Sequence, residues 1–162
     1  MMFKSSFPPV ATAEARVLIL GSLPGERSLA EQRYYAHPQN QFWRLLSPIV
    51  GRDLMTLDYQ ARLEAVQLKG IALWDVVATA RRTGSSDATI RDAAANDLPV
   101  LLDALPRLRA IAFNGGKALA IGRPLVGGRD LTIRALPSSS PLHTIGLAAK
   151  QPAWAAIAAF LC

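Results

Sequence analysis

Two polar side chains stand where they could act directly on a bound molecule, namely Asn40 and Asp75. The Asn40 amide directly precedes a helical pattern and could position a water molecule or a sugar. Asp75 ends an apolar run, and because a carboxylate only accepts hydrogen bonds, it could receive an N–H group of a ligand. Each residue also has an ordinary structural interpretation. Asn40 fits a helix N-cap, and Asp75 fits a turn cap or an ion-pair partner of Arg81 or Arg82.

A glycine- and proline-rich segment follows the first apolar run. Its glycines allow the backbone to approach a ligand closely, and its proline stiffens the turn. A phosphate-binding loop of a nucleotide-binding protein is an alternative, although the Lys-Ser/Thr pair of a Walker loop is missing. The connection over residues 21–40 is long, which is typical of functional loops. The segment consists of Gly21, Ser22, Leu23, Pro24 and Gly25.

A second polar segment lies near the C-terminus and contains three consecutive serines. Ser138, Ser139 and Ser140 offer hydroxyl groups and backbone amides that could bind phosphates. A serine-rich surface turn is the alternative. Lys117, after an Asn-Gly-Gly sequence, is a further candidate for contact with phosphate.

Hydrophobic patterning predicts the elements that must position these residues. Short apolar runs predict buried strands, and patterns that begin after Asn40, Thr56 and Asp97 predict helices. Strands that alternate with helices indicate a three-layer α/β/α sandwich around a central, mostly parallel four-stranded sheet. Ligands bind at the carboxyl edge of such a sheet, so the polar segments should meet there. We expect strands over residues 16–20, 70–74, 110–113 and 131–136, and helices over 41–46, 57–68, 98–105 and 153–161.

Composition narrows the class of protein. The chain has 162 residues, 51% of them hydrophobic and 19% charged, which predicts one domain over residues 1–162. A single cysteine, Cys162, and only two histidines, His37 and His143, predict a protein without metal or other cofactor. The apolar segment 153–162 is too short to span a membrane, and residues 1–10 lack the core of a secretory signal. We therefore expect a cytoplasmic monomer with no membrane partner.

The charge of the chain points to an anionic partner. Its net charge is +6 and its isoelectric point is about 10.1. A basic surface raises the local concentration of polyanions, and arginine suits phosphate geometry. Nucleic acid or an anionic metabolite is therefore the expected partner. A genome that prefers arginine codons would produce the same composition.

Three motifs together resemble the uracil-DNA glycosylase superfamily. The sequence Y-A-H-P-Q-N-Q-F-W over residues 35–43 resembles the F-A-H-P-x-N-x-F-W segment of mismatch-specific uracil-DNA glycosylases. Leu73-Trp74-Asp75 stands where members read the base edge, and P-S-S-S-P-L-H over residues 137–143 is similar to their DNA-intercalation loop. The motifs occur in the family's order, and the resemblance spans residues 17–143.

One departure from the family pattern indicates the branch. Many members place a water-orienting Asn or Asp where this chain has Leu23, whose alkyl side chain can neither hold water nor accept a proton. The G-S-L-P-G form resembles the hypoxanthine-DNA glycosylases, a resemblance that implies a catalytic role for Asn40. It also implies that Tyr35, or else Tyr34, stacks on an extruded base and that Asp75 reads that base. Leu142 would be the wedge that fills the vacated stack.

The resemblance therefore implies a monofunctional DNA glycosylase that acts on DNA containing a deaminated base, with hypoxanthine the leading substrate. The protein would work near the nucleoid in base excision repair. One alternative is a uracil or thymine mismatch glycosylase. Another is a non-catalytic nucleic-acid binder that lost its chemistry at Leu23. The loops show no obvious pair of acidic residues of the kind that glycosidases use.

Overall fold

A four-stranded parallel sheet forms the centre of the computed structural model, which describes residues 2–161. Its strands are β2 (Val17–Gly21), β3 (Ile71–Asp75), β6 (Ala110–Asn114) and β7 (Thr132–Leu136). They lie in the order β3-β2-β6-β7, and every neighbouring pair is parallel. All four predicted strands are thus confirmed, each within one residue of its expected start and end.

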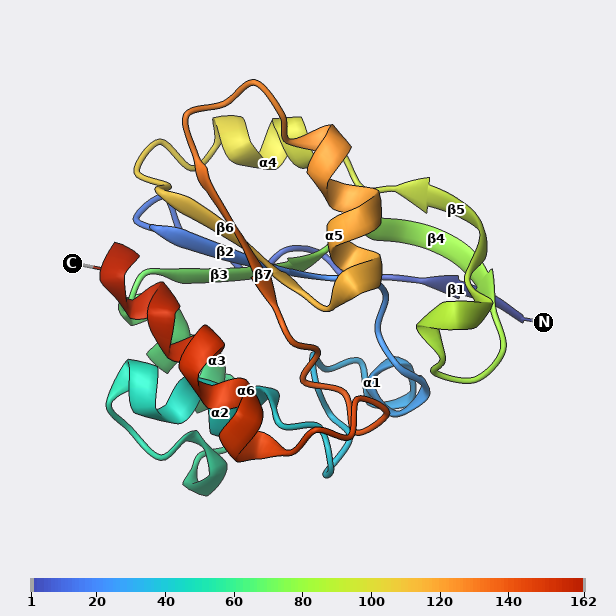
Figure 1. The fold of residues 1–162 in the computed structure, drawn as a ribbon, viewed down its shortest axis with the longest axis horizontal. Coiled ribbons are helices and arrows are strands. Elements are labelled where there is room, and N and C mark those ends of the chain that lie inside the picture. The colour runs from blue at the N-terminus through green and yellow to red at the C-terminus, as the bar shows by residue number, and fades with distance from the viewer. Residues whose placement is uncertain (1, 162) are drawn as a thin grey trace.

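Helices cover both faces of this sheet (Figure 1). Alternate residues of a strand point to opposite faces, and on β2 Val17 and Ile19 join one apolar cluster while Leu18 and Leu20 join another. The first cluster packs against α2 (Phe42–Val50), α3 (Tyr59–Leu68) and α6 (Leu147–Ala155). The second packs against α4 (Leu98–Asp103) and α5 (Gly116–Gly122). The predicted α/β/α sandwich is confirmed.

Several helix ends differ from the predicted ones. The cap of α4 is Asp97 as expected, but α3 is capped by Asp58, whose Oδ1 accepts the Ala61 N–H at 2.8 Å, and not by Thr56. The last helix begins after Gly146, six residues before the predicted start, and continues into the 3₁₀ segment η4 (Ala156–Phe160). Two shorter 3₁₀ turns are η1 (Leu54–Thr56) and η3 (Arg123–Leu125).

A second sheet was not predicted. It contains β1 (Met2–Ser5), β4 (Val77–Arg82) and β5 (Arg91–Ala95), which pair antiparallel in the order β1-β4-β5. Arg81 forms an exposed ion pair with Asp92 across β4 and β5, so the suggested pairing of Arg81 with Asp75 is wrong. The connection from β4 to β5 holds η2 (Asp87–Thr89), and α1 (Glu26–Glu31) follows the first glycine-rich segment.

The described residues 2–161 contain no helix that is long and apolar enough to cross a membrane. Within the same range, no three His, Cys, Asp or Glu side chains are grouped so that they could hold a metal ion.

The close packing of α5 on the sheet makes a specific prediction at Gly122. A Cβ atom there would lie 2.8 Å from Val76 Cγ2 and closer still to the Phe113 ring. We expect Gly122→Ala to lower the free energy of unfolding by about 1–3 kcal/mol through overpacking, as measured by urea denaturation. Gly116→Ala, on the same helix with open space around it, is the control and should be neutral or stabilising by up to about 1 kcal/mol. Equal effects of the two substitutions would contradict this packing.

Candidate active site at the carboxyl edge of the sheet

The polar segments predicted from the sequence converge on one cavity of about 460 Å³. It lies where β2, β3, β6 and β7 end, the edge at which parallel α/β sheets bind ligands. Every residue proposed from the sequence for catalysis, substrate binding or DNA binding lines it. They are Gly21, Ser22, Leu23, Pro24, Gly25, Tyr35, Asn40, Asp75, Lys117, Ser138, Ser139, Ser140 and Leu142.

Gly21, Asp75 and Tyr35 are packed so closely that the first must be glycine. A Cβ atom on Gly21 would lie 2.6 Å from Asp75 Oδ1 and 3.1 Å from the Tyr35 hydroxyl oxygen. Gly21 and Asp75 are opposite each other at the ends of the paired strands β2 and β3. The strand register therefore delivers the carboxylate to the cavity, and the missing side chain of Gly21 leaves room for it.

Asp75 is buried with part of its hydrogen-bonding capacity unused. Its side chain is 3% exposed, and its Oδ2 is fully buried without a hydrogen-bond partner. Burial, reinforced by the negative charge of Asp87 and opposed by Arg82, raises the pKa of Asp75 from 3.8 to about 7. An unpartnered buried carboxyl oxygen that lines a cavity is a group for which a ligand can supply the missing partner.

Tyr35 is held in an unusual conformation beside Asp75. Its φ of +54° is in the left-handed region that non-glycine residues rarely adopt. Phe42 stacks on the Tyr35 ring with centroids 3.6 Å apart and an angle of 11° between the planes. One face of Tyr35 is therefore covered, and a base could stack only on the other. Tyr34 also lines the cavity, but its hydroxyl donates to the Pro8 carbonyl at 2.9 Å and its side chain is 4% exposed.

Asn40 combines the two roles that the sequence left open. Its Oδ1 accepts the Phe42 N–H at 2.9 Å, an N-cap-like bond at the start of α2, and its partly exposed side chain also lines the cavity. The residue that immediately precedes the helix is Gln41, which makes no side-chain cap bond. A carbonyl oxygen has two lone pairs, so the capping bond leaves Asn40 able to bind water.

The Leu23 side chain has a packing role that its place in the motif did not suggest. Its side chain is 6% exposed and packs with Val77, Ala80 and Ile90, which belong to the second sheet and its connection. Leu23 can therefore meet a substrate through its backbone only. The leucine is an apolar anchor that fastens the first loop to β4.

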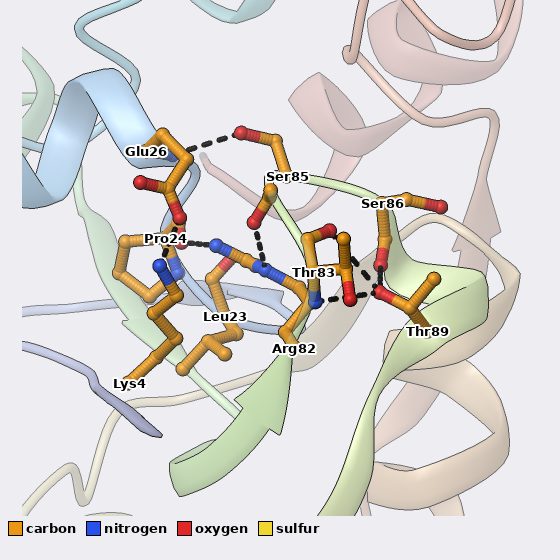
Figure 2. A network of polar contacts seen from close by, with 10 residues as sticks. Lys4, Leu23, Pro24, Glu26, Arg82, Thr83, Ser85, Ser86 and Thr89 are labelled. Atoms are coloured by element: carbon orange, nitrogen blue, oxygen red, sulfur yellow. Dashed lines mark hydrogen bonds and ion pairs between the residues drawn. The ribbon is translucent and has the colours of Figure 1, made fainter. Parts of the chain in front are cut away.

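A buried arginine fixes the same loop from the other side (Figure 2). Arg82 is 1% exposed, and its guanidinium donates to the carbonyls of Leu23 at 3.2 Å, of Gly84 at 2.8 Å and of Pro24. The next turn of the loop is held by Glu26, whose N–H donates to Ser85 Oγ at 2.8 Å and whose carboxylate pairs with Lys4. The carbonyls of Leu23 and Pro24 thus point to Arg82.

The serine segment is fastened by residues from β6 and α6. Asn114 accepts the Ser139 N–H at 2.9 Å and donates to Ser139 Oγ at 2.9 Å. Trp154 donates to the Pro137 carbonyl at 2.9 Å, and Lys150 donates to the Ser140 carbonyl at 3.3 Å. Ser139 is 1% exposed, so its predicted role in phosphate binding is replaced by a structural one.

The rest of the segment is accessible. Ser138 and Ser140 are partly exposed, and each hydroxyl oxygen accepts a nearby backbone N–H, that of Ser140 or Leu142, at 3.1 Å. Leu142 is 65% exposed and stands at the rim of the cavity. These residues keep the surface position that contact with DNA requires.

Sequence reasoning missed four residues of this site. Asp87, whose Oδ2 accepts the Ser22 hydroxyl at 2.7 Å, and Arg82 come from the unpredicted second sheet and its connection. Asn114 was noted as part of a strand-end loop, but its clamp on Ser139 has no local signal. Lys150 is buried and donates to the serine segment, whereas Lys117 was the lysine that the sequence suggested for this edge.

Comparison with known proteins agrees with the fold. A sequence model described as the Uracil DNA glycosylase superfamily matches residues 8–159. The chain belongs to this superfamily.

Relatives within it cover almost the whole chain. A protein of Methanosarcina barkeri named hypoxanthine DNA glycosylase is 40% identical over 154 residues, which are 95% of this chain and 97% of the relative. One of the same name from Methanosarcina acetivorans is 38% identical and covers 96% and 98%. A solution NMR structure from M. acetivorans, provisionally named a uracil DNA glycosylase, has a TM-score of 0.89 at 38% identity and 99% coverage of both chains.

The buried carboxyl group predicts a pH-dependent stability. Because the pKa of Asp75 is higher in the folded protein than its ordinary value of 3.8, the native state holds a proton that the unfolded chain releases. Stability from this group is complete at low pH and is lost as pH rises through about 7. We expect the melting temperature of Asp75→Asn to rise relative to that of the parent protein as pH rises from 3.8 to about 7. Asp92→Asn, at an exposed position, should show a constant difference; a constant difference for Asp75→Asn too would contradict the shifted pKa.

Proposed function

We propose that this protein is a monofunctional DNA glycosylase that hydrolyses the N-glycosidic bond of a deaminated base in DNA, with hypoxanthine as its leading substrate. The observation that carries the proposal is the buried, unpartnered Oδ2 of Asp75 in a cavity lined by Tyr35 and by the serine segment. The names of the curated relatives support it. A cytoplasmic, nucleoid-associated monomer is the corresponding expectation for the cell.

The protonation state of Asp75 determines how this residue distinguishes hypoxanthine from uracil. Hypoxanthine presents N1–H with one neighbouring carbonyl, whereas uracil presents N3–H between two carbonyls. An ionised carboxylate accepts the N–H of either base but faces the carbonyl oxygens with like partial charge. A neutral carboxyl group both accepts the N–H and donates to a carbonyl, so it suits both bases. Discrimination therefore depends on the protonation state of Asp75.

The remaining residues fit the steps that such an enzyme requires. A target base must leave the helix and stack in a pocket, for which the face of Tyr35 that does not contact Phe42 is suited. Leu142, exposed at the rim, would fill the vacated stack, and Ser138, Ser140 and Lys117 would bind flanking phosphates. Backbone amides of the first loop would stabilise negative charge on the departing base, and Asn40 would orient the attacking water.

A panel of labelled duplexes tests the glycosylase activity and the preference for one base over another in the same experiment. Duplexes that contain hypoxanthine, uracil, xanthine or a G·T mismatch are incubated with the protein and treated with hot alkali, which cleaves at abasic sites. We expect hypoxanthine to be released fastest. Because Asp75 ionises as pH rises through about 7, uracil release should fall more steeply than hypoxanthine release over that range. Absence of strand cleavage for every duplex, with retained binding, would indicate a non-catalytic binder.

Substitution at Asn40 separates catalysis from capping. We expect Asn40→Ala to reduce single-turnover release of hypoxanthine by roughly two or more orders of magnitude, as for the loss of one preorganised polar group. Loss of the bond to the Phe42 N–H should also cost about 0.5–2 kcal/mol of stability.

Asn40→Asp is the matched control for the cap, because aspartate accepts the same N–H and can still hold water, so its stability should persist. A folded Asn40→Ala protein with full activity would remove the catalytic assignment and leave only the cap.

A further inference from the structure

We propose that Asp87 is the general base of this site and that Asp75 is its acidic partner, so that the enzyme works with two carboxyl groups. This inference rests on the proposed function. It also corrects the expectation that the loops contain no such pair, because the fold brings to one cavity the carboxyl groups of Asp75, at the end of β3, and Asp87, in the connection between β4 and β5.

The two carboxyl groups line the same cavity but belong to different parts of the fold. Asp75 ends β3 in the central sheet, and Asp87 begins η2 in the connection between β4 and β5. Ser22, in the first loop, donates its hydroxyl to Asp87 at 2.7 Å. The loop expected to stabilise the departing base is thereby tied directly to the second carboxylate.

Burial raises the pKa of both carboxyl groups, but the charge of Asp87 has more partners that stabilise it. The Asp87 carboxylate receives the Ser22 hydroxyl and faces the positive charges of Arg82 and Lys117, all of which oppose the rise that burial causes in its pKa. Asp75 has an oxygen with no partner, and burial together with the Asp87 charge raises its pKa to about 7. When one proton is shared, it resides on Asp75 and Asp87 is ionised. The tyrosines Tyr34 and Tyr35 face Asp75 as neutral groups, because burial raises the pKa of both.

No other titratable side chain in the described lining of the cavity fits the role of base as well. Glu26 is engaged by Lys4, and His37 and His143 are exposed at the surface, with His37 Nδ1 already accepting the Gln39 N–H at 3.1 Å. The Leu23 side chain is buried in an apolar cluster. The Asn40 amide can hold a water molecule but is too weakly basic to take its proton.

Release of the base couples cleavage of the glycosidic bond to the addition of water. The C1′–N9 bond of the deoxyinosine breaks, its electron pair leaves with the base, and the sugar gains oxocarbenium character. Water held by Asn40 adds to C1′ and gives its proton to the Asp87 carboxylate. Asp75 donates its proton to an acceptor of the departing base, so the products are an abasic sugar and neutral hypoxanthine. The two carboxyl groups exchange their protonation states and recover through solvent.

Asp87→Asn tests this assignment, because the amide oxygen still accepts the Ser22 hydroxyl while the basic group is gone. We expect single-turnover release of hypoxanthine at neutral pH to fall roughly 10²–10⁴-fold, the usual contribution of a general base. The affinity for lesion duplex and the melting temperature should change little. Loss of the facing charge should also move the pH dependence assigned to Asp75 to lower pH.

Asp92→Asn, on exposed β5 of the same sheet, is the matched control and should keep the parent rate and pH profile. If the parent protein releases hypoxanthine and Asp87→Asn retains its rate and pH profile, the inference is overturned while the glycosylase function stands. If the parent protein releases no base, the proposed function itself fails. A rate loss that appears together with an equal loss of melting temperature and duplex affinity would assign Asp87 a structural role and overturn its role as base.

Discussion

The first loop owes its shape to a single buried cation, Arg82. Removing a guanidinium from water is costly unless its donors are satisfied, and here three backbone carbonyls, those of Leu23, Pro24 and Gly84, accept from it. Because the carbonyls turn inward to the arginine, the opposite edge of the loop is left for a ligand. The same contact draws the second sheet against the central one and brings Asp87 within reach of Ser22. The shape of the cavity therefore depends on the contact between the two sheets.

Several unfavourable features meet at this cavity, and a well-packed framework surrounds it. Tyr35 has a left-handed backbone, Asp75 has an unpartnered buried oxygen, and Gly21 allows a close approach of these two side chains. Strain of this kind persists only where the surroundings determine it. Here those surroundings are the Phe42 ring, which stacks on Tyr35, and the fully buried strand β2. A ligand N–H that reaches Asp75 Oδ2 would supply the missing partner, so binding energy at this site would depend on the hydrogen-bonding pattern of the ligand.

The sequence was informative for the central sheet and silent for the second sheet. The four central strands are apolar runs bounded by turn residues, and their parallel arrangement by itself brought the predicted segments to one edge. β5, by contrast, has the sequence R-D-A-A-A with every residue exposed, and neither its pattern nor its propensity indicates a strand. Asp87 and Arg82 were missed with that sheet. The clamp between Asn114 and Ser139 spans 25 residues and could not be read from local spacing.

The position of Leu23 connects the fold to the chemistry. In many members of the superfamily the third residue of this loop is polar and serves the attacking water, whereas here the same position contributes an apolar side chain to a cluster with Val77, Ala80 and Ile90. A leucine there removes the local water ligand but fastens the loop to the second sheet. That attachment is what carries Asp87 to the cavity, since its connection begins where β4 ends. The Leu23 cluster and the bond from Ser22 to Asp87 both join the first loop to the second sheet and its connection, so an amide introduced at Leu23 would weaken this attachment before it could hold a water molecule.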